Sequence, residues 1–371
     1  MNEPSRREWI KSCLAAALSG VNAAFVSLVT ACSRKEKANA RYHVLMLDER
    51  KGRLAPSKAA RIDPNFEPAY LKLHQTGELK LRADKLWGIM ESCQLCPRQC
   101  GANRLAGDKG FCGSTSQLEI SAYHPHYGEE RPLVGTGGSG TIFLTNCSLQ
   151  CVFCINWEIS QGGLGEPCGV EDMASMMLRL QNRACHNINL VTPTHYSAHI
   201  LRAVDLAAEN GLRLPIVYNT CGWERVEMLK VLDGIVDIYL PDFKYADGGM
   251  ASRYSSGADT YPEITRTALL EMHRQVGVAK PAPDGLMYRG LMIRHLVMPN
   301  QVSGTREVVR WIAENLPKDT YVNLMSQYRP MYKAFKYPEI ARRITRQEYQ
   351  EGIDCARAAG LTNLEIQGYN G

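Results

Sequence analysis

The stretch TIFLTNCSLQCVFC, residues 141–154, decides how the rest of the chain is interpreted. Its first four residues include an apolar run, which predicts a short buried strand that ends near Asn146. Three cysteines follow with the spacing Cys-x3-Cys-x2-Cys: Cys147, Cys151 and Cys154. Three thiolates at this spacing can bind three irons of a [4Fe–4S] cluster and leave the fourth iron open. An open coordination position is what a catalytic metal site requires. The alternatives are a zinc site that lacks one ligand and a chance cluster of cysteines.

Length and composition narrow the class of protein. The chain has 371 residues, of which 45% are hydrophobic and 22% are charged. These values are typical of a globular enzyme and exclude a mainly disordered or many-spanning membrane protein. The net charge of +5 is too small and too dispersed to indicate nucleic-acid binding. The unusual number is 13 cysteines, seven of them between positions 93 and 154. Clustering of this kind in a long chain favours metal binding over disulfides.

Outward from the cysteine stretch, apolar runs alternate with segments of helical periodicity. Met173, Met176, Met177 and Leu180 lie on one face of an expected helix. Strands that alternate with helices predict parallel βαβ units. We therefore expect an α/β protein with a partial (β/α)6 barrel. Its six strands are expected at residues 141–144, 188–191, 214–218, 236–240, 292–298 and 321–325.

Polar side chains follow the expected strands at their carboxyl ends. In barrels of parallel strands, functional residues gather at this edge of the sheet. The sequence therefore predicts a catalytic rim. The residues at these ends are Asn146, Thr192, Thr194, His195, Asn219, Thr220, Asp242, Lys244, Asn300, Ser326, Gln327, Tyr328 and Arg329.

A second group of cysteines lies upstream, at Cys93, Cys96, Cys100 and Cys112. Four thiolates close a metal site, which can be structural zinc or an auxiliary [4Fe–4S] cluster. Their spacing does not choose the metal. The scattered Cys168, Cys185, Cys221 and Cys355 are expected to be small buried residues rather than ligands.

The Cys-x3-Cys-x-aromatic-Cys loop after the first barrel strand resembles the radical S-adenosylmethionine (SAM) superfamily. The wider pattern resembles its pyruvate formate-lyase activating enzyme-like branch, with an N-terminal four-cysteine motif, over about residues 90–345. This resemblance favours iron–sulfur in the four-cysteine segment. The supporting segments are CQLCPRQCGANR (93–104), GFCG (110–113), HNINLVTPTH (186–195), PIVYNTCG (215–222) and RHLVMP (294–299).

The resemblance implies an activity. The open iron would bind SAM, and one electron from the cluster would cleave it to methionine and a 5′-deoxyadenosyl radical. In activating enzymes this radical removes hydrogen from a glycine of a partner protein, and a reductase or a flavodoxin- or ferredoxin-type protein supplies the electron. Two alternatives stay open: the same radical chemistry on another peptide or small molecule, and an exported iron–sulfur protein that only transfers electrons.

The resemblance also implies roles for individual residues. Phe153 occupies the aromatic position near the adenine, and Arg294 the position that can pair with the methionyl carboxylate. Thr192 and Thr194 stand where relatives carry a Gly-Gly-Glu type motif, so a contact to the methionine amino group would depend on backbone here. Strand alternation allows at most one of Arg294 and His295 to face the site. The remaining residues that the resemblance places at the cofactor are Asn219, Thr220, Asp242 and Lys244.

The N-terminal segment resembles an export signal. Arg6 and Arg7 precede a mildly apolar run, which is typical of a twin-arginine signal, and the residues before Cys32 resemble a lipobox. We therefore expect a protein of the cell envelope, with a membrane tether through Cys32. The alternative is a cytoplasmic protein with a short amphipathic helix. The expected organisation is a signal (1–32), a polar linker and N-terminal segment (33–85), a four-cysteine metal-binding segment (86–125), the radical SAM partial barrel (126–345), and a C-terminal helix and tail (346–371). Thr345 and Glu348 form a capping box at the start of that last helix.

Overall fold

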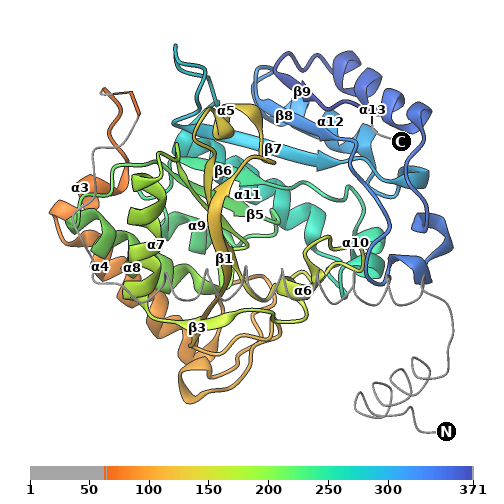
Figure 1. Cartoon of the computed structure of the whole chain (residues 1–371). Helices are drawn as coiled ribbons and strands as arrows, with labels where there is room; N and C mark the ends of the chain where they lie inside the picture. Colours follow the sequence, from red (N-terminus) through yellow and green to blue (C-terminus); the bar gives the residue numbers. More distant parts are fainter. Residues whose placement is uncertain (1–61, 64, 370–371) are drawn as a thin grey trace, which may run out of the picture. The chain divides into compact units, whose positions relative to one another are not determined.

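The computed structural model describes residues 62–63 and 65–369 (Figure 1). The expected export signal, with Arg6, Arg7 and Cys32, lies outside the described residues, as does most of the expected linker. Among the helices that are described, none combines the length and the apolar character needed to cross a membrane.

One nine-stranded sheet organises the described chain, with the order β3-β1-β2-β4-β5-β6-β7-β8-β9. Strands β2 to β9 are parallel, apart from β3, while β1 pairs antiparallel with both β2 and β3. The six expected strands are β2, β4, β5, β6, β7 and β8, side by side in chain order, which confirms the α/β class. Closure into a partial barrel stays a prediction. The strands are β1 (Leu118–His126), β2 (Ser139–Leu144), β3 (Glu166–Cys168), β4 (Ile188–Val191), β5 (Ile216–Thr220), β6 (Ile238–Pro241), β7 (Gly290–Leu296), β8 (Tyr321–Met325) and β9 (Leu364–Ile366).

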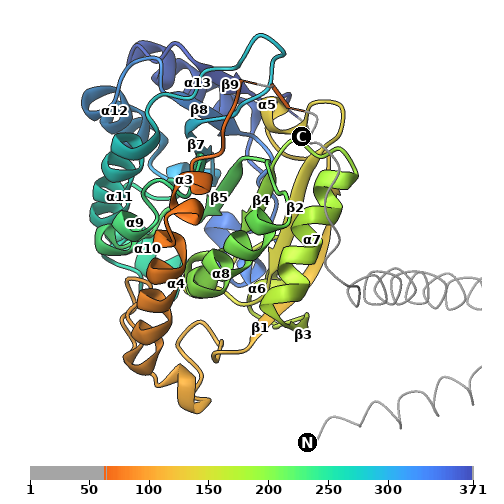
Figure 2. The ribbon, with the colours of Figure 1, turned by 90° about the vertical axis from the view of Figure 1, so that its left-hand side faces the viewer.

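Helices cover the sheet, and Figure 2 shows α7 and α8 beside one another along it. Each long helix presents an apolar stripe to its neighbours. In α7, Met173, Met176, Met177 and Leu180 are all fully buried, which confirms the expected helical face. The helices are α3 (Tyr70–Gln75), α4 (Glu78–Gly88), α5 (Arg131–Val134), α6 (Trp157–Ser160), α7 (Val170–Asn182), α8 (Ser197–Glu209), α9 (Val226–Val231), α10 (Gly248–Tyr254), α11 (Tyr261–Val276), α12 (Thr305–Asn315) and α13 (Arg346–Ala358), with 3-10 turns at Ile89–Ser92, Arg104–Ala106, Thr194–Tyr196, Pro299–Gln301, Ala334–Lys336 and Pro338–Ile340.

The segment expected to be a polar linker is helical in its last part. Helices α3 and α4 pack against α8. Leu79, Ala83 and Leu86 are fully buried at helical spacing, and Tyr70 donates a hydrogen bond to the carbonyl of Leu214 at 3.1 Å. The prolines upstream drew the sequence interpretation towards a linker, whereas this short apolar stripe determines the structure.

A buried apolar cluster packs helix α5 against the sheet. Leu133 of α5 belongs to it, together with Val217, Ile238, Leu240 and Met292 from successive strands. Each such side chain stabilises the fold by about 1.5–3 kcal/mol when it is removed from water.

The ladder between β6 and β7 is short. Only Ile238 with Gly290 and Tyr239 with Leu291 pair within the two strands. An isolated bridge between Asp242 and Arg294 follows further along. Pro241 lies between these contacts and has no backbone N–H to donate. We call this interrupted ladder the β6–β7 seam.

Candidate active site

The cysteine loop begins where β2 ends. Asn146 has a positive φ of 70°, and Gln150 one of 51°, so the chain turns sharply twice within the loop. The turns bring Cys147, Cys151 and Cys154 back towards the carboxyl ends of the strands. Cys151 is buried, and Cys147 and Cys154 are half-buried. The three cysteines therefore follow the first strand of the parallel set, where the sequence placed them.

The surroundings of the three sulfurs suit metal ligands. Ser255 donates a hydrogen bond to the Sγ of Cys151 at 3.2 Å, and the hydroxyl of Ser160 lies 3.2 Å from the Sγ of Cys154. Burial raises the pKa of Cys147 to about 11 and that of Cys151 to about 12. Such thiols stay protonated at neutral pH unless a cationic centre stabilises the thiolates. Desolvated thiols on one loop are therefore a donor set that fits an iron–sulfur cluster.

A single metal ion needs its protein ligands gathered around one point, which a cluster does not require. Within the part of the chain that the structure describes, no three His, Cys, Asp or Glu side chains are arranged to hold one ion. A [4Fe–4S] cluster instead binds each thiolate through a different iron. None of the described cysteines is in a disulfide.

A charged network lies at the strand ends beside the cysteine loop. Arg294 donates to Asp242 at 2.9 Å and to Asn219 at 2.5 Å, and Lys244 donates to Asp242 at 2.6 Å. Four of the expected site residues, from β5, β6 and β7, are thus in mutual contact. We call them the strand-end network.

The network holds fixed charges in spite of its burial. Although burial alone would raise it, the pKa of Asp242 is lowered because Arg294 and Lys244 are adjacent cations. The pKa of Arg294 is raised by Asp242 against the effect of burial. The positive charge of Lys244 also lowers the pKa of Cys147 and Cys151, although burial dominates there. Lys244 therefore connects the network electrostatically to the cysteine loop.

Two carboxyl groups that the sequence interpretation missed border this network. Glu129 lies 3.6 Å from Arg294, and burial raises its pKa to about 7. Glu130 accepts a hydrogen bond from Asn323 at 2.9 Å. The sequence feature that could have revealed these two carboxyl groups is the acidic pair in GEERP (128–132), which lies directly before a short helix.

The threonines at the expected site serve another buried acid. Thr194 donates to Glu224 at 2.5 Å, and Thr220 donates to the same carboxylate oxygen. Burial raises the pKa of Glu224 to about 7. Thr192 has a positive φ of 60° and donates its backbone N–H to Asn219. The structure thus gives the hydroxyls of Thr194 and Thr220 a partner within the chain, and Glu224 is a second residue that the sequence interpretation missed.

Aromatic and imidazole side chains complete the surroundings. The ring of Phe153 packs edge-on against Tyr245 and Tyr328, with centroids 6.3 and 5.9 Å apart. His195 contacts the carbonyl of Thr145, and burial lowers its pKa to about 3. His295 contacts the carbonyl of Phe243. Because Arg294 joins the strand-end network while His295 turns to a neighbouring backbone, the predicted alternation of the pair is confirmed.

The upstream cysteines form a compact knuckle. Cys93, Cys96 and Cys112 are buried, and Cys100 is exposed. Backbone hydrogen bonds from Cys93 to Ala102 and from Gly101 to Cys93 close the turn. A β-carbon added at Gly110 would lie 3.4 Å from the Sγ of Cys112 and 3.5 Å from that of Cys100. The knuckle therefore brings residues 12 positions apart around one glycine.

The other cysteines are scattered. Cys168 and Cys185 are buried, as expected, whereas Cys221 and Cys355 are half-buried. The backbone carbonyl of Cys221 accepts a hydrogen bond from Tyr261 at 2.8 Å.

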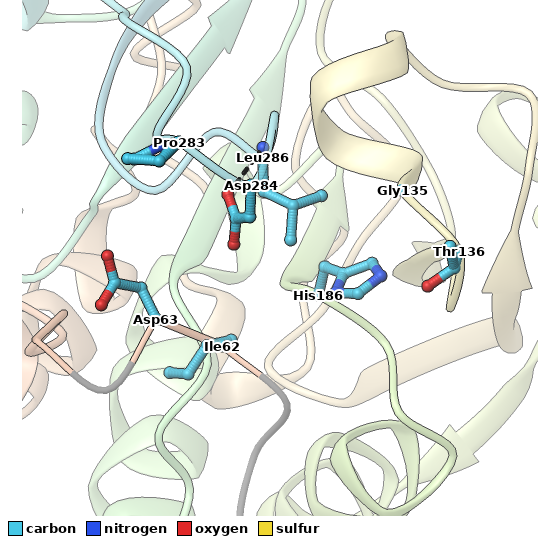
Figure 3. Close-up of a pocket in the computed structure, with 8 residues that line it drawn as sticks. All are labelled: Ile62, Asp63, Gly135, Thr136, His186, Pro283, Asp284 and Leu286. Carbon is cyan, nitrogen blue, oxygen red and sulfur yellow. Dashed lines mark hydrogen bonds between the residues drawn. The ribbon is translucent and has the colours of Figure 1, made fainter.

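A cavity of about 550 Å³ lies at the other end of the sheet (Figure 3). Gly135 and Thr136 precede β2, His186 precedes β4, and Leu286 precedes β7, so the cavity lines the edge where strands begin. None of the expected site residues contributes to it. We assign the chemistry to the carboxyl end instead, where the cysteine loop and the strand-end network meet.

Comparison with known proteins places the chain among relatives. No protein-family model matches it. One similar solved structure is a radical SAM methyltransferase from Sphaerobacter thermophilus, with a TM-score of 0.43 and 16% sequence identity. The match covers 60% of this chain and 66% of the methyltransferase chain, which is just under two thirds of the methyltransferase. The uncharacterized protein MJ0808 of Methanocaldococcus jannaschii is 24% identical over 268 residues, which are 66% of this chain and 73% of that protein. The uncharacterized protein MJ0674 of the same organism is 32% identical over 307 residues, which are 80% of this chain and 83% of that protein. At this identity and coverage, the chain belongs to the same family as MJ0674.

Proposed function

We propose that this protein is a radical SAM enzyme. The observation that carries the proposal is the position of the Cys147–Cys154 loop. It leaves the first parallel strand of the sheet and lies beside the strand-end network, with Lys244 close enough to influence two of its thiols. The expected cysteine ligands and the strand-end network then occupy the same edge of the sheet, where substrates of parallel α/β proteins bind.

The residues present suit a [4Fe–4S] cluster and SAM. Cys147, Cys151 and Cys154 would hold three irons. The cluster, when bound and reduced, supplies one electron that cleaves SAM to methionine and a 5′-deoxyadenosyl radical. Arg294 and Lys244 offer cations for the methionyl carboxylate, and Phe153 offers an aromatic face for the adenine. The chain's own contribution is to position these groups and to exclude water.

We further propose that the radical acts on a partner protein and generates a glycyl radical there. A glycine Cα of the partner would then lose one hydrogen atom, and 5′-deoxyadenosine would carry that hydrogen away. The motifs of the activating-enzyme branch support this choice. A reductase or a flavodoxin- or ferredoxin-type protein would supply the electron. A different peptide or a small molecule as substrate is the alternative within the same chemistry.

One assay separates enzyme from electron carrier. The protein is reconstituted with iron and sulfide without oxygen, reduced with dithionite and mixed with SAM. We expect 5′-deoxyadenosine and methionine in equal amounts from the parent chain, and none from Cys151→Ala. An intact cluster with no 5′-deoxyadenosine would contradict the proposal and favour the electron-transfer alternative.

The glycyl-radical step has its own measurement. A candidate partner protein is added to the reduced enzyme and SAM, and electron paramagnetic resonance is recorded. A carbon-centred signal that narrows or splits differently when the partner carries deuterated glycine supports the step. 5′-Deoxyadenosine without any such signal across candidate partners would favour a different substrate.

We also propose export to the cell envelope and tethering through Cys32, supported by the arginine pair and the lipobox-like residues. The measurement is fractionation of cells that express the full chain. Replacing Arg6 and Arg7 with lysines is expected to retain the protein in the cytoplasm. An unchanged distribution would remove the twin-arginine argument.

A further inference from the structure

A buried arginine without a carboxylate partner lies beside the four-cysteine knuckle. The side chain of Arg104 is completely buried. It donates to the carbonyls of Thr115 and His195, and to the Sγ of Cys93 at 3.8 Å. Among the described residues, no carboxylate forms an ion pair with it. Arginine is almost never buried without a countercharge, because an uncompensated buried ion is costly.

The cysteines are the groups placed to supply that countercharge. Cys93 is in direct contact with the guanidinium. Burial raises the pKa of the Cys112 thiol, and the positive charge of Arg104 opposes this shift. Cys112 and Cys100 in turn flank Gly110 from two sides. As neutral thiols they leave Arg104 uncompensated, whereas four thiolates bound to a metal centre carry net negative charge.

We propose that Cys93, Cys96, Cys100 and Cys112 bind a thiolate metal centre whose negative charge is balanced by the buried Arg104, and that this centre holds the Cys147–Cys154 loop in place through Arg98. The second half of this inference rests on the proposed function, since it takes the loop as the cluster site. The first half does not depend on it.

Arg98 provides the connection. It lies between two of the knuckle cysteines, Cys96 and Cys100, and its guanidinium donates to the carbonyls of Ser148 at 3.0 Å and Ser255 at 3.1 Å. Ser148 belongs to the cysteine loop, and the hydroxyl of Ser255 donates to Cys151. A metal centre that fixes the knuckle therefore fixes a donor that holds the loop.

One further hydrogen bond joins the same two segments, and ring contacts fix the position of Arg98. Gln150 of the loop donates to the carbonyl of Phe111, next to Cys112, at 2.9 Å. The guanidinium of Arg98 also stacks over the rings of Phe111 and Trp223, at 4.0 and 4.8 Å from their centroids. Metal binding that orders residues 93–112 should thus order residues 147–151 as well, because the two share these contacts.

The metal centre is tested first, in the full chain with Cys147, Cys151 and Cys154 all replaced by alanine. We expect iron and sulfide to remain bound, as a cluster requires. Adding Cys96→Ser and Cys112→Ser should remove both, whereas Cys355→Ser, at a thiol outside both groups, should not. A triple variant that binds no iron and sulfide after reconstitution, or that binds zinc without sulfide, would overturn the proposal, because no three of the described cysteines are arranged around one ion.

Arg104 is tested in the same background by competition with a chelator. Arg104→Met removes the countercharge and should weaken metal retention by about 10- to 100-fold, while Arg104→Lys should restore part of it. If Arg104→Met does not fold, hydrogen exchange of residues 93–112 in the triple variant is compared with and without chelator. This comparison measures how far metal binding orders the knuckle. Equal exchange in both conditions would count against the centre.

The connection is tested by hydrogen exchange of residues 146–154. Arg98→Gln should speed exchange in the loop while the knuckle keeps its metal, and Arg98→Lys should show a smaller increase. Arg346→Gln is the matched control, because Arg346 of α13 also lies over an aromatic ring, that of Tyr369, at 5.6 Å from its centroid. No difference between the Arg98 and Arg346 variants would overturn the role of Arg98. Because none of these readouts needs SAM, absence of 5′-deoxyadenosine in the enzyme assay leaves them interpretable.

Discussion

Arg294 and Asp242 form an ion pair across the β6–β7 seam, with 2.9 Å between Nε and Oδ1. The pair lies where the strand ladder has already been interrupted, and the backbone of Phe243 donates to the carbonyl of Arg294 beside it. One side-chain pair therefore does two things. It joins the two strands at this point and holds the guanidinium beside Asn219 of β5.

Removing Arg294 should destabilise the fold strongly. Arg294→Met leaves Asp242 buried with Lys244 as its remaining cation, and breaking a buried pair costs about 3–5 kcal/mol. Urea unfolding without oxygen measures the change. Arg310→Met, at an exposed position of α12, is the control and should stay within about 0.5 kcal/mol of the parent. An equal, small effect of both substitutions would show that the pair contributes little to stability.

Glu224 should make stability depend on pH. Burial raises its pKa from 4.5 to about 7. The folded state therefore binds the proton more tightly than the unfolded state, and this contribution to stability is complete below about pH 4.5 and lost as the pH rises through 7. The shift corresponds to about 3 kcal/mol at most. Glu224→Gln keeps the acceptor for Thr194 and does not titrate.

Thermal unfolding at pH 5 and pH 8 measures this effect. The melting temperature of Glu224→Gln, relative to the parent chain, should be clearly more favourable at pH 8 than at pH 5. An equal difference in melting temperature between the variant and the parent at pH 5 and at pH 8 would mean that Glu224 does not titrate in this range.

Gly222 should not tolerate a side chain. Its φ is +81°, and a β-carbon would lie 2.0 Å from the carbonyl oxygen of Asp242. Gly222→Ala adds this clash to the ordinary strain of a left-handed residue, which is about 1–2 kcal/mol. Gly257→Ala isolates the strain, since Gly257 has a φ of +75° with open space around it. Urea unfolding should show a clearly larger loss for Gly222→Ala, and equal losses would mean that β6 shifts without cost.

The capping box of α13 offers a local measurement. Thr345 accepts a hydrogen bond from the backbone of Glu348, and Glu348 accepts one from the backbone of Thr345. Thr345→Ala should cost about 1 kcal/mol in unfolding free energy. Gln350→Ala, which loses only an exposed contact to Asp354, should cost a few tenths. A Thr345→Ala loss as small as that of Gln350→Ala would show that the cap is not needed.

Local pattern was enough to predict six of the nine strands, together with the position of the loop, whereas β1, β3 and β9 were missed. The six parallel strands are continuous apolar runs, and the Met face of α7 repeats at helical spacing, so both can be recognised without knowing their neighbours. Strand ends in a parallel sheet meet at one edge. This rule placed Asn219 and Asp242 at one edge, and the family resemblance added Arg294, which contacts Asn219 from 75 residues further along the chain.

What escaped prediction depends on three-dimensional partners. Glu129 and Glu224 look like ordinary loop acids, and only the structure shows that each is buried against groups far along the chain. Arg104 is one of 43 basic residues in the sequence, and its lack of a carboxylate partner within the described chain becomes visible only once its neighbours are placed. Helix α4 was missed because its apolar stripe is short and its other faces are strongly charged.

The β6–β7 seam also has a mechanical meaning. A carboxylate ligand that binds Arg294 must compete with Asp242 for the same guanidinium, and Asp242 is one of the few contacts that join the two halves of the sheet beyond Tyr239. Ligand binding at Arg294 and the Asp242 contact across the seam would then be thermodynamically linked, in both directions. A carboxylate ligand would thus be measurable as a change in the stability of the sheet, even with no chemistry taking place.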